Sequence, residues 1–184
     1  MKNLLLASVI AACSLPATAE NYVDINLDFL TFKASGLDNV SNQVLNFGFG
    51  QKLNDNLAIE ASLGFGIGDD TVSEEGISAT IKTNSLLALN LIGQAPISEK
   101  LYAQANIGYS RIDAKTTANY TYYDGYSTAS VSGSASDSES AFGAGVGLQY
   151  SLNSQTNLHA NYKYLGKFEE VKISGFRVGA SYQF

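Results

Sequence analysis

The chain has 184 residues, enough for one domain, and its formal net charge of −6 argues against nucleic acid as a partner, because phosphate binding needs a basic surface. It contains 17 Gly, 11 Tyr and 9 Phe but 2 Pro, and beyond its N-terminal segment no stretch approaches the roughly 18 apolar residues of a helical membrane span. Helical spans are therefore excluded and a β-protein is favoured.

The N-terminal segment has the pattern of a secretory signal. A basic start at Lys2 is followed by the apolar run Leu4 to Leu15 and by Ala17-Thr18-Ala19, the small-x-small pattern that signal peptidase cleaves. We predict that residues 1–19 are a signal peptide and that the mature chain begins at Glu20. A lipoprotein signal ending at Cys13 is a less favoured alternative, because that signal would be unusually short. Cys13 is the single cysteine, so the mature chain has no disulfide framework.

The remaining sequence, residues 20–184, predicts one all-β domain. Eight segments alternate between apolar and polar residues with the period of a β-strand. The fourth is the least regular, because Leu86, Ala88 and Ile92 blur its alternation. In chain order the segments are 23–31, 45–53, 57–67, 81–91, 101–109, 142–152, 158–164 and 176–184.

The two faces of these segments differ in charge. The apolar faces contain no Asp, Glu, Lys or Arg, although charged residues make up 15% of the chain. A surface in water would not avoid charge so completely, so this is the lipid-out, polar-in pattern of a transmembrane β-barrel. Glycines such as Gly48, Gly50 and Gly147 lie on the polar face, where they leave room for larger inward side chains. On the outside of a soluble barrel they would weaken the strands.

The connections predict the orientation of the barrel. Three are short, at 54–56, 97–100 and 153–156, whereas those at 34–40, 69–78, 115–138 and 166–172 are longer and more polar. Outer-membrane barrels place short turns in the periplasm and long loops outside, so both termini should be periplasmic. An open sheet edge in lipid would leave backbone groups unpaired, so the first strand must pair with the last.

The C-terminal segment resembles the last strand of outer-membrane β-barrel proteins. Its alternating residues are Phe176, Val178, Ala180, Tyr182 and the terminal Phe184. The whole mature chain is similar to the small eight-stranded barrels of the OmpX-like and OmpA-membrane-domain type. This resemblance implies an eight-stranded antiparallel up-and-down barrel in the outer membrane of a Gram-negative bacterium. It also implies recognition of the last strand by the barrel-assembly machinery, and contact with outer-membrane lipid and lipopolysaccharide.

Charged residues on the inward face predict an ion network in the lumen, because a buried unpaired ion is costly. Arg177 on the last strand should meet Asp24 or Asp28 on the adjacent first strand. The charges nearest the rims can reach water instead. The full set of expected members is Asp24, Asp28, Lys52, Glu60, Lys82, Lys163 and Arg177.

The connection between the fifth and sixth strands predicts a projecting hairpin that carries recognition. Its tip includes Asp124-Gly125, a strong signal for a two-residue turn, which would pair Tyr123 with Tyr126 and Ile107 with Phe142. Tyrosines amid Ser, Thr and Ala are typical of binding loops. The residues assigned to this surface are Tyr120, Tyr122, Tyr123, Asp124, Gly125 and Tyr126.

The sequence carries no clear catalytic, metal or cofactor motif. His159 is the single histidine, and Asn161 stands where the His-x-Ser pattern of outer-membrane lipid A deacylases has serine. Gly64 to Gly68 is glycine-rich, but no helix follows to bind phosphate. We therefore expect no cofactor and no enzyme. The expected function is a structural or surface-recognition role toward a host or cell-surface ligand, and a small channel or porin-like protein is the alternative. A lipid A-modifying enzyme is less favoured.

Overall fold

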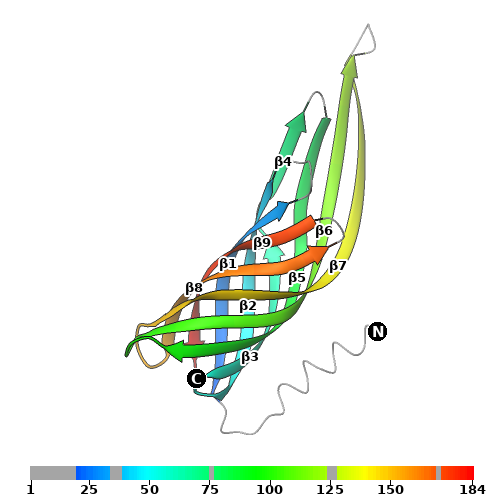
Figure 1. Cartoon of the computed structure of the whole chain (residues 1–184). Coiled ribbons are helices and arrows are strands. Elements are labelled where there is room, and N and C mark those ends of the chain that lie inside the picture. The colour runs from blue at the N-terminus through cyan, green and yellow to red at the C-terminus, as the bar shows by residue number, and fades with distance from the viewer. Residues whose placement is uncertain (1–19, 34–38, 75–76, 124–127, 169–170) are drawn as a thin grey trace.

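The computed structural model describes residues 20–33, 39–74, 77–123, 128–168 and 171–184. Within these ranges the chain forms antiparallel β-strands joined by turns (Figure 1). The strands are β1 (Asn21–Lys33), β2 (Val40–Asn54), β3 (Leu57–Gly66), β4 (Asp69–Glu74), β5 (Ile77–Pro96), β6 (Leu101–Tyr123), β7 (Thr128–Ser151), β8 (Thr156–Phe168) and β9 (Val171–Gln183).

The strands close into a barrel. Apart from β3 and β4, each strand pairs with its sequence neighbour; β1 also pairs with β9, and β3 pairs with β5. Both β3 and β4 pair with β5, and they occupy successive stretches of the same edge of β5. They therefore count together as one strand of the barrel. The result is an eight-stranded up-and-down barrel, as the sequence predicts.

The apolar face of the strands points outward. On β1, Val23, Ile25 and Phe29 are 42 to 49% exposed, whereas Asp24 and Asp28 between them are buried. On β7, Phe142 is 80% exposed. Large apolar side chains in such numbers on an outer surface require a lipid environment. No helix in the described part of the chain is long and apolar enough to cross a membrane.

Much of the chain expected as extracellular loop is strand. The expected loop at 69–78 contains β4 and the start of β5, and the described residues of the expected loop at 115–138, which are 115–123 and 128–138, extend β6 and β7. Ser, Thr and Tyr fit the pleated surface of a sheet, so strand pairing continues beyond the apolar band. The outer parts of β4, β5, β6 and β7 thus form a sheet that projects past the rest of the barrel (Figure 1). This part is called the extracellular sheet below.

Candidate functional site

A buried ion pair joins the first and last strands. Asp28 of β1 and Arg177 of β9 are register partners. The guanidinium binds the carboxylate with two nitrogens, at 2.5 Å from Nε to Oδ1 and 2.6 Å from Nη2 to Oδ2. Glu60 of β3 lies 3.7 Å from Arg177 Nη1, and all three side chains are almost fully buried. A bidentate pair of this kind fixes both position and orientation.

A hydrogen-bonded chain continues from this pair toward the periplasmic end. Tyr22 donates to Glu60 Oε2 at 3.2 Å, and Asn26 Nδ2 donates to Asp24 Oδ2 at 3.0 Å. The Asn26 amide oxygen then faces His159 Nε2 at 2.6 Å, so the histidine donates from this nitrogen. His159 is thus a buried hydrogen-bond donor that links β8 to β1.

The sequence predicted seven members of the lumen network, and the structure separates them. Asp24, Asp28, Glu60, Lys163 and Arg177 are buried inside the barrel. Lys52 lies at the periplasmic rim, where its ammonium is 2.9 Å from Glu20.

The assignment of Lys82 to the lumen is wrong. A bulge between Thr83 and Ser85 inserts one extra residue in β5, and the alternation reverses there. Thr83 is therefore fully buried and Lys82 is exposed on the outer face, so Ile81 and Thr83 do not belong to the lipid face either. The blurred alternation at Leu86 was the visible sign of this bulge.

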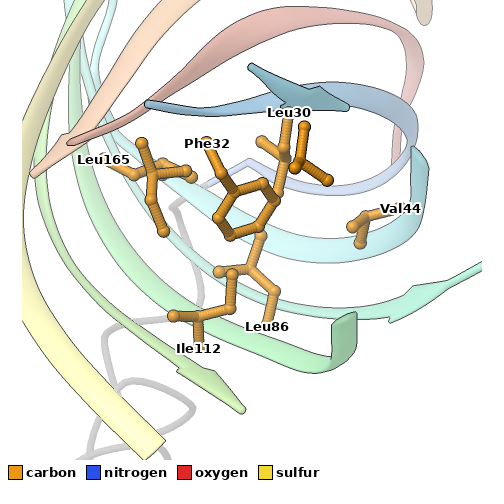
Figure 2. Close-up of a cluster of buried hydrophobic side chains, with 8 residues drawn as sticks. Leu30, Phe32, Val44, Leu86, Ile112 and Leu165 are labelled. Carbon is orange, nitrogen blue, oxygen red and sulfur yellow. The ribbon is translucent and has the colours of Figure 1, made fainter. Parts of the chain in front are cut away.

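The outer half of the lumen is apolar, which the sequence analysis missed. Leu30 and Phe32 of β1, Leu86 of β5, Ile112 of β6 and Leu165 of β8 converge inside the barrel (Figure 2). The complete set, called the apolar plug, is Leu30, Phe32, Val40, Val44, Leu86, Ile112, Leu165 and Ile173. Two apolar residues in succession, such as Phe29-Leu30 and Leu86-Leu87, could have predicted this apolar lumen, because one residue of each two must face inward.

Below the apolar plug a cavity of about 50 Å³ remains, which is room for a water molecule or two. Its walls include Tyr22, Glu60, His159 and Arg177, and it extends toward Lys52 at the periplasmic rim. In the described ranges, no group of three or more His, Cys, Asp and Glu side chains could hold a metal ion. This part of the lumen is a packed polar core.

The extracellular sheet has a long unpaired edge. β7 pairs with β6 along its whole length, but its pairing with β8 covers Ala144 to Ser151. Among the described residues, Thr128 to Ser140 therefore have no strand partner on the side away from β6, whereas Ala141 to Gly143 lie against Tyr164 to Gly166 of β8. Near the base, Asp113 accepts hydrogen bonds from the hydroxyls of Ser138 and Ser85. These bonds lower the pKa of its carboxyl.

The predicted register of this hairpin is wrong by two residues. The structure pairs Tyr123 with Thr128, Tyr109 with Phe142 and Ile107 with Ala144. A register shift of two residues keeps every side chain on the same face of the sheet, so the alternation of apolar and polar residues could not reveal this error. Tyr120, Tyr122 and Tyr123 lie on β6, and Tyr120 is 49% exposed. Asp124, Gly125 and Tyr126 lie outside the described residues, and so does the turn assigned to them.

The comparison with family models decides the identity of the fold. Residues 4–184 match the model of the outer membrane protein beta-barrel domain. The chain belongs to this family. Its localisation in the outer membrane and its resemblance to small eight-stranded barrels follow from this membership and from the closed ring of strands. No curated protein matches the sequence.

Solved outer-membrane barrels have the same fold at low sequence identity. The attachment invasion locus protein Ail of Yersinia pestis is 19% identical with a TM-score of 0.61, over 90% of this chain and 99% of that one. Neisserial surface protein A is 14% identical with a TM-score of 0.59, over 89% and 97%. The N-terminal barrel of Pseudomonas aeruginosa OprF is 14% identical with a TM-score of 0.52, over 91% and 100%. At these identities the likeness concerns the fold.

Proposed function

We propose that this outer-membrane barrel has a surface-recognition or adhesion role, carried by the β6–β7 hairpin of the extracellular sheet. The observation behind the proposal is the β6–β7 hairpin, which projects past the barrel and leaves one edge of β7 unpaired. An unpaired edge is a template for a strand of another chain, and main-chain hydrogen bonds supply the affinity in such contacts.

The composition of this edge supports a binding role. Natural edge strands are usually protected by Lys, Pro or bulges, and Thr128 to Ser140 contains no Lys and no Pro. No register shift interrupts the pairing of β6 with β7. Tyr120 and Val131 are directly opposed and are 49% and 60% exposed. An accessible backbone edge and exposed apolar side chains therefore occur together.

The likeness to Ail is consistent with a surface role, since that protein is named for attachment and has been solved with the heparin analogue sucrose octasulfate. A sulfated ligand is not carried over to this chain, because Asp137 and Glu139 make the β7 edge acidic. The proposed ligand is a host or cell-surface protein.

A deletion tests the proposal. Removing residues 116–137 should leave a barrel that is still heat-modifiable on gels, because the barrel strands stay paired, and should abolish adhesion of cells that display the protein. The control is a shortened β4–β5 hairpin lacking residues 73–78, which should retain adhesion. Adhesion that survives loss of residues 116–137 would refute the proposed role.

The channel alternative is less well supported. The apolar plug and the Arg177–Asp28 pair obstruct the lumen at successive levels, and eight strands enclose an interior that side chains just fill. We propose no enzymatic activity, because the side chain of His159 is 6% exposed and its Nε2 is hydrogen-bonded to Asn26.

Biogenesis is proposed to follow the family pattern, with residues 1–19 removed after export and β9 recognised by the barrel-assembly machinery. The residues of that signal are Phe176, Val178, Ala180, Tyr182 and Phe184. Phe176, Val178, Tyr182 and Phe184 are 45 to 64% exposed on the outer face. Lipopolysaccharide is the proposed lipid partner in the outer leaflet.

A further inference from the structure

Three lysines form a row across adjacent strands at the extracellular end of the barrel. Lys33 at the end of β1 is the register partner of Lys172 on β9. Lys172 is in turn the partner of Lys167 on β8. All three side chains are exposed. These residues are called the lysine row below.

The lysine row lies on the lipid-facing side of the sheet. Lys33 follows the alternation of the exposed Phe29, and Lys172 follows that of the exposed Phe176. Lys167 owes its position to a bulge between Tyr164 and Gly166. Leu165, in the apolar plug, and Gly166 are therefore both on the inward side, and Lys167 points outward.

Like charges that face each other directly on neighbouring strands destabilise a sheet. The described residues next to the row carry no charge: Thr31 and Ser174 occupy the preceding outward position on β1 and β9, and Asn39 precedes β2. Within the described ranges no ion pair involves any of the three lysines. Among the described residues the three cations thus have no carboxylate partner, and an external anion would relieve their mutual repulsion.

Two other outward cations at this end have a carboxylate nearby. Arg111 Nε lies 3.6 Å from Asp113 Oδ1, and Lys82 is the register partner of Asp69. Lys82 also faces Lys115 on β6, but its partner on β4 is Asp69, whereas no described acidic residue is a register partner of the lysine row.

The height of the row matches the lipid headgroups. Phe29, Phe176 and Tyr162 form an outward aromatic row across the same three strands, with the last two rings 5.1 Å apart. The lysine row lies four residues further along β1 and β9, which is about 13 Å along a strand and about 10 Å along the membrane normal at the usual tilt. Aromatic side chains favour the membrane interface, so the ammonium groups reach the headgroup layer.

We propose that the lysine row binds the phosphate groups of a phosphorylated glycolipid of the outer leaflet, the lipid A portion of lipopolysaccharide. The anion comes from the lipid because the row faces outward along the barrel wall, where the leaflet surrounds it. This site rests on the placement of the barrel in the outer membrane and is independent of adhesion by the β6–β7 hairpin.

Binding of lipid A to the refolded protein in neutral detergent tests the site. Wild type should bind bisphosphorylated lipid A, and the triple variant K33Q/K167Q/K172Q should bind on the order of a hundredfold more weakly, at about fivefold per lysine. The control K52Q/K100Q removes two lysines near the periplasmic end and should stay within about twofold of wild type. Dephosphorylated lipid A should not distinguish the triple variant from wild type. All variants are first checked for heat-modifiability.

Three results would overturn the proposal. One is an equal affinity of wild type and the triple variant for lipid A. Another is a loss of lipid A affinity in K52Q/K100Q as large as that in the triple variant. The third concerns Glu169 and Glu170, which lie between Lys167 and Lys172 in the sequence. If wild type fails to bind and E169Q/E170Q binds, neighbouring carboxylates already neutralise the row.

Acetylation of the lysines separates the lipid from free phosphate. Lipid A should protect Lys33, Lys167 and Lys172 from the reagent, and inorganic phosphate at the same phosphorus concentration should not. Equal protection by inorganic phosphate would make this a general anion site and would refute the lipid assignment.

Discussion

Arg177 is the residue on which the buried polar core of the barrel depends, since its guanidinium contacts both Asp28 and Glu60. Replacing it with alanine would leave two buried carboxylates without their cation. We expect Arg177→Ala to lower the free energy of unfolding by about 3–5 kcal/mol. Urea titration of the refolded protein in lipid vesicles measures this change.

The matched control for Arg177 is Lys52, which pairs with Glu20 at the periplasmic rim. Lys52→Ala should cost less than about 1 kcal/mol, because an exposed pair gains little over its hydration. If Arg177→Ala unfolds at the same urea concentration as wild type, the buried pair contributes no net stability.

Gly166 allows the bulge after which Lys167 points outward. Its φ of +128° lies in the region that residues with a β-carbon avoid, and a β-carbon there would overlap Ala141. We expect Gly166→Ala to destabilise the barrel by about 1–3 kcal/mol, measured by thermal unfolding on gels. Gly133→Ala is the control, since a β-carbon at Gly133 meets no neighbour and φ there is not positive. Equal losses in both variants would contradict this account.

At the scale of elements, the register of β6 with β7 is the feature that the turn signal failed to predict. The structure pairs Thr117 with Ser134, whereas a two-residue turn at Asp124-Gly125 would pair Thr117 with Ser132. A cysteine pair at 117 and 134 should form a disulfide in the cysteine-free mature chain, because directly opposed residues have suitable Cα separations. Cysteines at 117 and 132 should cross-link far more slowly. Mass shifts on non-reducing gels distinguish the two registers, and the reverse order of rates would support the two-residue turn.

At the scale of the whole molecule, the obstructed lumen predicts no substantial pore. Planar-bilayer recordings of the refolded protein should show little or small, irregular conductance, because the apolar plug and the Arg177–Asp28 pair block the lumen. A general diffusion porin in the same bilayer is the positive control. Large and stable conductance steps would favour the channel function instead.

Export of the whole molecule gives a prediction about its mass. The intact mass of the membrane-purified protein should correspond to residues 20–184, since Ala17-Thr18-Ala19 fits the cleavage pattern. Glu20 would then be the first residue, held at the rim by Lys52 and Gln183. A mass that retains Cys13 with acyl chains would show a lipoprotein instead.

The eight crossings and the outward apolar face follow from the sequence alone, because alternation with period two and the exclusion of charge are local properties of each strand. The closure of β1 on β9 follows from the cost of unpaired backbone groups in lipid. Closure also makes the first and last strands neighbours, which indicated Asp24 or Asp28 as the partner of Arg177, and the structure shows Asp28. The tertiary structure decided the side of Lys82 and Lys167, because each depends on a one-residue bulge that reverses the alternation. It also decided the apolar plug and the lysine row, because these sets join residues from strands far apart in sequence, and a register shift of two changes such neighbours without changing any face.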